Sequence, residues 1–384
     1  MAASEVKEAE AKSKVAPQQV PGQVVLVLQG GGALGAYQGG VYQALHEAGI
    51  EPNWVIGTSI GAINGAIIAG NEFDARLDRL REFWKLIEGD SFLSGTLLPG
   101  ELTGVLAGVA TLFGGVPNFY TPNTSALLGM RASVGVENAA FYSTKVLAKT
   151  LAGLIDFERL KSVKPRLTIG AVNVLSGQMH YFDSRSEVLT SDHVLASGAL
   201  PPAFAAIRIN GDPYWDGGLY SNTPIETVFD DNPRRDSVVF SVQMWHSSGP
   251  EPKSIWEVLN RQKDIQFGSR AESHIARQGQ IHRLRHIVRE LVQMLPEGSR
   301  NLDEVKKFAG YGCGTTMHII RLNAQRLDGD DNSRDTDFTR AGIAARWQAG
   351  YADTAQTLER QPWQIPVDPM AGVAVYDSDQ LATE

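Results

Sequence analysis

A serine in a glycine-flanked turn is the first candidate for chemistry in this chain. The pattern Gly57-x-Ser59-x-Gly61 matches the nucleophile elbow, a sharp strand-to-helix turn that strains the serine backbone and exposes its hydroxyl at a helix N-terminus. The pattern alone is weak in a glycine-rich chain. Here an apolar run at 54–56 precedes it and a stretch of small residues at 62–69 follows it, which is the context that the motif requires. This context predicts a nucleophilic serine.

A second glycine-rich turn lies upstream, between an apolar run and a helical pattern, and contains Gly30, Gly31 and Gly32. Acyl transfer at a serine needs a base for the hydroxyl proton and donors for the oxyanion of the tetrahedral intermediate. Unencumbered glycine N–H groups near a helix N-terminus suit the second task, so the sequence predicts an oxyanion hole in this turn.

The same turn also fits Gly30-x-Gly32-x-x-Gly35, the dinucleotide-binding fingerprint. A dinucleotide domain should present an acidic residue at the end of its second strand to bind the ribose. In this chain the second strand ends in Gly57-Thr58-Ser59 instead. The missing acid disfavours the dinucleotide interpretation.

A third glycine-rich turn, Asp216-Gly217-Gly218, follows a short strand pattern at 214–215. An isolated Asp-Gly pair is by default only a turn. This one closes a longer phrase that runs through 196–204 and 211–218 and ends at Asn222-Thr223-Pro224. With the three turns in this order, residues 23–245 resemble the patatin-like phospholipase family, which comprises acyl hydrolases with a Ser-Asp dyad.

The resemblance implies a serine acyl hydrolase that cleaves carboxylic esters of lipids, of the phospholipase A type, through an acyl-serine intermediate and without a metal or cofactor. By the same likeness Ser59 is the nucleophile and Asp216 is the base that takes its proton. The oxyanion donors are the amides of Gly30, Gly31 and Gly32, with Gly31 and Gly32 the best placed. The other motif glycines shape the turns: Gly35, Gly57, Gly61, Gly217 and Gly218.

This chain departs from the family pattern at two positions. Leu34 stands where the family often has Arg or Lys, and Leu200 is an extra bulky residue before the prolines of the phrase at 196–204. Neither change removes a catalytic group. The sequence leaves open an acyltransferase, a thioesterase or short-chain esterase on the same dyad, and a non-catalytic binding module.

Other side chains offer weaker candidates for chemistry. Ser197 lacks an elbow and is expected to form hydrogen bonds within its turn. His318 follows Ser59 and Asp216 in the order of an α/β-hydrolase triad, but a strand histidine is more often structural. His282 and His286 have a spacing that could hold a metal, although a solvated helix face is the preferred interpretation.

The elements that position these turns follow from hydrophobic patterning. Continuous aliphatic runs predict buried strands of a parallel sheet, and each of the first two runs is followed by a glycine turn and a helix. We expect an α/β fold, a three-layer α/β/α domain with a mainly parallel central sheet and a helical C-terminal extension. The expected strands are 24–28, 54–56, 167–174, 178–182, 207–209, 214–215, 237–244 and 315–322, and the main expected helices are 36–48, 62–69, 77–87 and 337–358.

The chain divides into four expected regions. Residues 1–22 form a disordered N-terminal tail, and 23–245 form the catalytic core. Residues 246–360 form a mostly helical region that packs on the core, and 361–384 a loose tail. Within the core, the glycine-rich apolar segment at 102–116 could be a lid or a packed loop.

Composition restricts the partners and the compartment. The net charge of −8 over 384 residues disfavours nucleic acid as a partner, and the single cysteine, Cys313, excludes an intramolecular disulfide. No signal-peptide or membrane-spanning run is present, so the expected location is cytoplasmic. A basic excess at 261–290 leaves open peripheral contact with a membrane or another anionic partner, although a solvated helix face with one buried stripe is the preferred interpretation. No feature specifies an oligomeric state.

Overall fold

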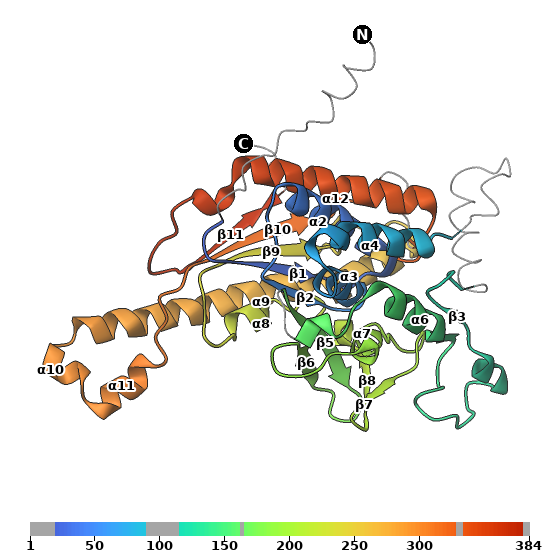
Figure 1. Ribbon diagram of the computed structural model, residues 1–384, viewed down its shortest axis with the longest axis horizontal. Helices are drawn as coiled ribbons and strands as arrows, with labels where there is room; N and C mark the ends of the chain where they lie inside the picture. Colours follow the sequence, from blue (N-terminus) through green and yellow to red (C-terminus); the bar gives the residue numbers. More distant parts are fainter. Residues whose placement is uncertain (1–19, 90–114, 162–164, 328–332, 379–384) are drawn as a thin grey trace, which may run out of the picture.

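A nine-stranded sheet forms the centre of the computed structural model, which describes residues 20–89, 115–161, 165–327 and 333–378 (Figure 1). The strand order is β11-β10-β9-β1-β2-β5-β8-β7, with β6 paired to β5. The six strands from β11 to β5 are parallel, and β6, β7 and β8 add antiparallel pairs beyond them. The strand bounds are β1 Gln23–Leu28, β2 Trp54–Gly57, β5 Arg166–Asn173, β6 Met179–Asp183, β7 Ile207–Ile209, β8 Asp212–Asp216, β9 Ser237–Gln243, β10 Met317–Asn323 and β11 Val373–Asp377.

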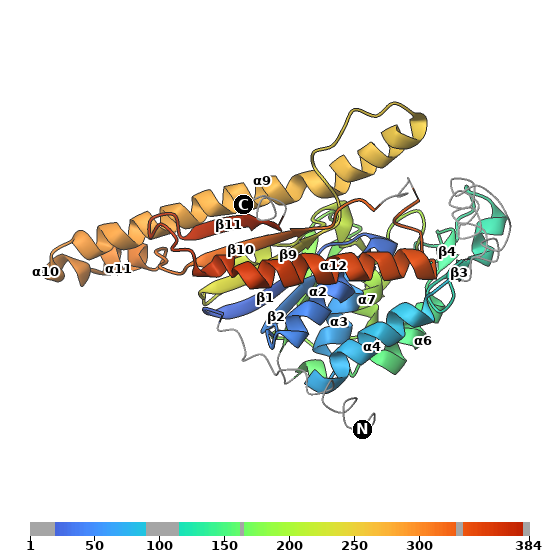
Figure 2. The ribbon, with the colours of Figure 1, turned by 90° about the horizontal axis from the view of Figure 1, so that it is seen from above.

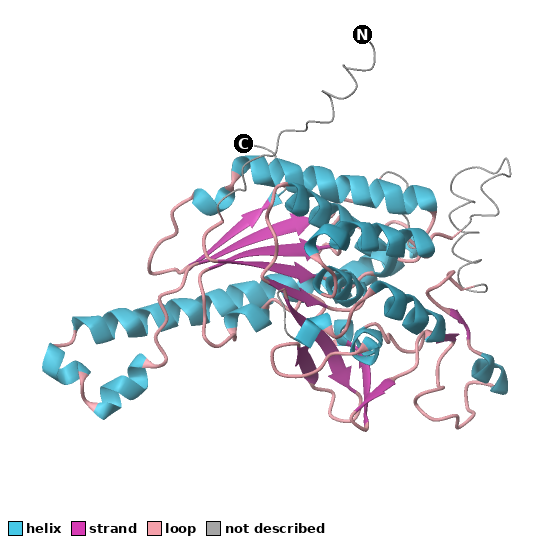
Figure 3. Ribbon diagram, in the orientation of Figure 1, coloured by secondary structure: helices cyan, strands magenta, loops and turns pink. Residues whose placement is uncertain are grey.

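Helices cover both faces of this sheet (Figures 1 and 3). One face carries α2 (Ala36–Glu47), α3 (Ile60–Ala69), α4 (Phe73–Leu86), α6 (Lys145–Leu154), α7 (Ser191–Ser197) and α12 (Arg340–Arg360). The other carries α8 (Glu226–Phe229) and α9 (Ile255–Met294). Short elements complete the described chain: β3 Thr121–Pro122, β4 Tyr142–Ser143, α10 Glu297–Arg300, α11 Asp303–Ala309, and the 3-10 turns η1 Gly32–Gly35, η2 Thr124–Leu128, η3 Arg159–Lys161, η4 Gly217–Leu219 and η5 Pro362–Gln364.

Strand β1 shows why the fold has three layers. Its aliphatic side chains alternate between two hydrophobic cores, because successive side chains of a strand point to opposite faces. Val24, Leu26 and Leu28 pack under the α2 and α3 side, and Val25 and Val27 pack under the α8 and α9 side. A strand that is apolar on both faces belongs in the middle of a covered parallel sheet, so the expected three-layer α/β/α fold is confirmed.

The chain after residue 245 enters the central sheet. Strand β10 pairs with β9, and β11 then extends the sheet from β10 with Val373 opposite Met317. The expected loose tail at 361–384 is therefore wrong for residues 373–377. Those five residues are half-buried or exposed at the sheet edge, so their own pattern is too short and too open to indicate a strand.

Helix α9 runs along the second face of the sheet, and its C-terminal part extends past the strands together with α10 and α11 (Figure 2). No helix among the residues that the structure describes is both long and apolar enough to cross a bilayer. The expected N-terminal tail falls almost wholly outside the described residues, as does the candidate lid at 102–116.

Candidate active site

The sheet register brings the glycine turns to one edge. Leu28, the last residue of β1, lies opposite Gly57, the last residue of β2, and the carboxyl ends of parallel strands share one edge of a sheet. Gly57 in turn lies opposite Ile169 of β5. Strand β8 pairs antiparallel with β5 so that Asp216 lies opposite Ala171, two residues beyond Ile169. The aspartate therefore reaches the edge where the serine turn begins.

Ser59 occupies a strained elbow between β2 and α3. Its backbone has φ +56° and ψ −123°, a combination that L-residues rarely adopt and that marks functional turns. A Cβ at Gly57 would lie 2.3 Å from the Gly61 carbonyl oxygen, and a Cβ at Gly61 would lie 2.2 Å from the Leu28 carbonyl oxygen. Both flanking positions therefore require glycine, as the motif predicts.

The nearby hydroxyl of Ser197 supports this elbow. It accepts a hydrogen bond from the Ser59 N–H at 2.9 Å and donates one to the Gly170 carbonyl at 2.6 Å. The Ser197 side chain is fully buried and its proton is already donated. Its bonds run to other segments of the chain and not within its own turn, so its role is to hold the elbow, which the sequence did not reveal.

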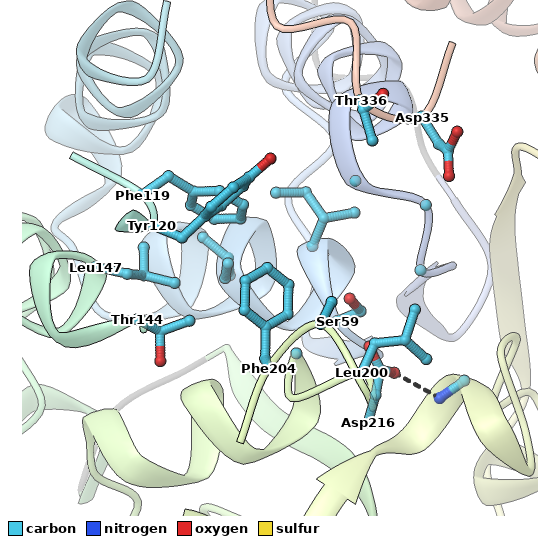
Figure 4. Close-up of a pocket in the computed structure, with 18 of the residues that line it drawn as sticks. Ser59, Phe119, Tyr120, Thr144, Leu147, Leu200, Phe204, Asp216, Asp335 and Thr336 are labelled. Atoms are coloured by element: carbon cyan, nitrogen blue, oxygen red, sulfur yellow. Dashed lines mark hydrogen bonds between the residues drawn. The ribbon is translucent and has the colours of Figure 1, made fainter. Parts of the chain in front are cut away.

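Asp216 lies at the end of β8, buried beneath the elbow (Figure 4). Its carboxylate accepts a hydrogen bond from the Gly218 N–H at 2.7 Å, and the Ser59 hydroxyl is close enough to stabilise its charged form. Burial raises the pKa of Asp216 to about 7, and the Gly218 N–H and the Ser59 hydroxyl oppose that rise without cancelling it. A carboxyl group with a pKa near neutrality is a better proton acceptor than an ordinary aspartate.

The glycine loop after β1 lies against the same cavity. Within the described residues, the N–H groups of Gly31 and Gly32 donate no hydrogen bond to the protein. The Gly30 N–H donates to Asn222, with the side-chain oxygen at 3.1 Å. The expectation that Gly30 shares the oxyanion role is therefore corrected, because its donor is already engaged. Asn222 belongs to the phrase that surrounds Asp216 in the sequence, but the sequence does not indicate its contact with Gly30.

A cavity of about 210 Å³ joins these groups. Ser59, Asp216, Gly31 and Gly32 lie on its wall, and most of the remaining wall is apolar. Figure 4 shows Phe119, Tyr120 and Leu147 on one side of the cavity and Phe204 beside Ser59. The Tyr120 ring stands 5.2 Å from the Phe204 ring and 5.0 Å from the Tyr142 ring, centroid to centroid, so the aromatic wall is continuous. A reacting group at Ser59 would therefore extend into apolar surroundings.

The histidine candidates lie elsewhere. His318 is buried on β10 beside the Tyr376 hydroxyl, and it does not line the cavity. His282 and His286 are buried, so the expected solvated face is wrong for them. Their Nε2 atoms lie 3.2 Å apart, both beside the Thr315 carbonyl oxygen. A Cβ at Gly372 would lie 2.5 Å from the His286 Nε2 atom, so the turn before β11 is what covers this helix face.

Comparison with known proteins now gives the family. The family model described as "Patatin-like phospholipase" matches residues 26–229, more than half of the chain. The chain belongs to the patatin-like phospholipase family. A second model, described as "Patatin phospholipase", matches residues 265–370, which include most of α9, strand β10 and α12.

Three similar proteins match this chain either over a short segment or with low sequence identity. Lysophospholipase nte1 of Aspergillus terreus is 61% identical over 46 residues, which are 12% of this chain and 3% of that protein. VipD of Legionella pneumophila aligns over 97% of this chain and 78% of its own, with 17% identity and a TM-score of 0.41. The ExoU–SpcU complex of Pseudomonas aeruginosa aligns over 91% and 65%, with 18% identity and a TM-score of 0.29. The fold assignment rests on the sheet order and layers described above.

Proposed function

We propose that this chain is a serine acyl hydrolase that cleaves carboxylic esters of lipids, with Ser59 as the nucleophile and Asp216 as the base. The observation that carries the proposal is that the strained Ser59 shares a cavity wall with a buried aspartate whose pKa is about 7. A serine hydroxyl becomes an effective nucleophile when an adjacent base can take its proton. Asp216 is within reach of that proton, and its pKa suits transfer near neutral pH.

The reaction has two halves. In the first, Ser59 Oγ attacks the ester carbonyl carbon while its proton passes to Asp216, and the carbonyl oxygen becomes an oxyanion. The free N–H groups of Gly31 and Gly32 are the proposed donors to that oxyanion. Collapse of the intermediate breaks the carbon–oxygen ester bond, and Asp216 returns the proton to the departing alcohol. Water then attacks the acyl-serine with Asp216 again acting as base, which releases the acid and restores Ser59.

The cavity wall favours an acyl chain as the group bound next to Ser59. Its lining is mostly apolar and includes Phe119, Leu147, Phe204 and Phe338. An alkyl chain gains about 0.8 kcal/mol for each methylene that it buries. A lipid ester therefore binds better here than a polar ester of the same size.

The first test is covalent labelling with a fluorophosphonate, read by intact mass and peptide mapping. We expect a single adduct on Ser59 and no adduct on the Ser59→Ala variant. Labelling should be greatly slowed in Asp216→Asn. The matched control is Asp212→Asn, the same change at the exposed start of the same strand, which should label like the wild type.

Failure of a well-folded wild-type protein to label would contradict the proposal and favour a binding module. A labelled protein is then assayed for release of free fatty acid from phospholipid and from simple and thioester substrates. Release of free acid in water supports hydrolysis. Product that forms only when an alcohol or amine acceptor is added would instead identify an acyltransferase on the same serine.

We also propose that the protein is cytoplasmic and contacts membranes peripherally. The one cysteine of the sequence is buried as a free thiol, which suits a reducing compartment. The first turns of α9 expose an apolar cluster, Ile255, Trp256, Val258 and Leu259, of which Ile255 is 80% exposed. Such side chains gain free energy when they enter a lipid interface. Co-sedimentation with phospholipid vesicles should decrease for Trp256→Ser, and equal binding by both proteins would contradict the proposed contact.

A further inference from the structure

The glycine loop is covered by a segment far from it in the sequence. Residues 333–338 form a strap that crosses the loop, and Figure 4 shows Asp335 and Thr336 of this strap at the cavity. The Ala33 N–H donates to the Asp335 carbonyl at 2.9 Å. A Cβ at Gly32 would lie 2.3 Å from that same oxygen. The strap backbone therefore lies directly against the residue that carries one of the free amides.

Helix α9 holds the strap through two ion pairs. The Lys263 ammonium lies 2.8 and 2.9 Å from the two carboxylate oxygens of Asp335. Asp264, the next residue, is fully buried and accepts a hydrogen bond from Arg334 at 2.5 Å. Arg326 binds the second oxygen of Asp264. Two consecutive residues of α9 thus fix two consecutive residues of the strap.

Arg334 also contacts the residue on the other side of the glycine loop, Trp245. Its guanidinium lies 5.2 Å from the centroid of the Trp245 ring, and the Trp245 indole N–H donates to the Gly30 carbonyl at 2.8 Å. A Cβ at Gly31 would lie 3.2 Å from that indole nitrogen. Gly30, Gly31 and Gly32 are therefore enclosed between Trp245 and the strap, and Arg334 of the strap lies against the Trp245 ring.

We propose that Lys263, Asp264 and Arg334 are positioning residues for the oxyanion hole, which act by fixing the Gly31 and Gly32 amides through the strap and Trp245. This inference rests on the proposed function. It assigns the region after residue 245 a part in the chemistry of the core. Oxyanion stabilisation depends on donors held in place before the reaction, so a loosened loop lowers the rate of the chemical step more than it weakens binding of the substrate.

Substitution of Arg334 or Asp264 is expected to destabilise the fold. Arg334 and Asp264 are almost completely excluded from solvent, and a buried charge left without its partner is strongly destabilising. Their variants can fail to fold for that reason alone. Lys263 and Asp335 are partly exposed, with side chains 32% and 21% accessible, so this pair can be broken in a folded protein.

The experiment compares Lys263→Gln, Asp335→Asn and the double variant with the wild type, using a short-chain ester. We expect kcat to fall about three- to tenfold with little change in KM, since complete loss of one oxyanion donor costs about 10²–10³ in kcat. The double variant should lose less than the product of the two single losses, because both substitutions break the same ion pair. The apparent pKa of the pH–rate profile should stay unchanged, because the Ser59 and Asp216 dyad is intact.

Arg321→Gln is the matched control. Arg321 pairs with Asp377 between β10 and β11, in a somewhat more buried ion pair, and neither residue lines the cavity. It should lose stability and keep its kcat. A kcat in Lys263→Gln that equals the wild-type value would overturn the inference, as would an equal loss in Arg321→Gln. Absence of hydrolysis by the wild type would instead refute the proposed function. Arg334→Lys, which keeps the charge, should retain more activity than Arg334→Gln, and the reverse order would also contradict the inference.

Discussion

With Asp216 as the base that we propose, its pKa should make the rate of catalysis sensitive to pH near neutrality. Burial takes this carboxyl from its ordinary value of 3.8 to about 7. With a pKa near 7, about a tenth of the molecules carry the ionised base at pH 6 and about nine-tenths at pH 8. Only the ionised form can take the Ser59 proton. We therefore expect kcat/KM to rise about tenfold between pH 6 and pH 8, with an acid limb of unit slope.

The alternative gives a clearly different curve. An aspartate with its ordinary pKa is about 99% ionised at pH 6, so kcat/KM would be flat over the same interval. The assay is release of free acid from an uncharged short-chain ester, measured by chromatography at constant ionic strength so that the signal does not itself depend on pH. A flat profile from an active, folded enzyme would refute the reasoning about Asp216.

A second group that titrates near pH 7 could imitate this result, and stability measurements separate the two explanations. A carboxyl whose folded-state pKa is raised contributes its stability fully below the unfolded pKa and loses it as pH rises through the folded pKa. A rise from 3.8 to about 7 corresponds to about 4 kcal/mol at the alkaline end. If Asp216 is the titrating group, Asp216→Asn should remove this part of the pH dependence of unfolding.

Further substitutions test the site and the packing of helices α2 and α6. Asp216→Asn should abolish turnover yet raise the free energy of unfolding at pH 8 by up to about 4 kcal/mol in urea titrations, and an inactive but less stable variant would contradict the burial argument. Ser197→Ala leaves the Ser59 N–H without an acceptor, so it should cost about 1–3 kcal/mol and lower kcat, whereas Ser197→Thr with full activity and stability would show that the hydroxyl suffices. Gly40→Ala should cost more than about 2 kcal/mol because its Cβ would lie 1.9 Å from the Trp347 carbonyl oxygen of α12, while Gly153→Ala, with open space around it, should stabilise helix α6 by about 0.5–1 kcal/mol.

Apolar runs and glycine positions in the sequence predicted the strands and the turns that follow them. The apolar runs at 24–28 and 54–56 became β1 and β2, and the turn after each run has the glycines that its close contacts demand. The strand patterns at 167–174 and 178–182 became the antiparallel pair β5 and β6. The contact that requires glycine at position 57 lies within its own turn, at the Gly61 carbonyl oxygen, and β5 and β6 are consecutive strands.

Features that depend on contacts between distant segments could not be predicted from such patterns. Strand β11 is recognisable only beside β10, which satisfies its backbone groups. The histidine pair at 282 and 286 is buried because the turn at Gly372 covers it, and nothing near residue 282 in the sequence indicates that turn. The engagement of Gly30 likewise depends on Asn222, which is 192 residues away.

The same long-range contacts determine how much of the chain makes up the catalytic unit. The three sequence motifs end at Gly218, and the first family model ends at residue 229. The free amides that they supply are nevertheless bounded by Trp245 after β9 and by Asp335 before α12. Helix α9 contacts both segments, through Phe267 against the Trp245 ring and through Lys263 at Asp335. Strand β10 also covers the edge of β9 that residues 23–245 alone would leave open. In the mechanism that we propose, the motifs supply the reacting groups, and the region after residue 245 supplies the surfaces that keep two of those groups in place.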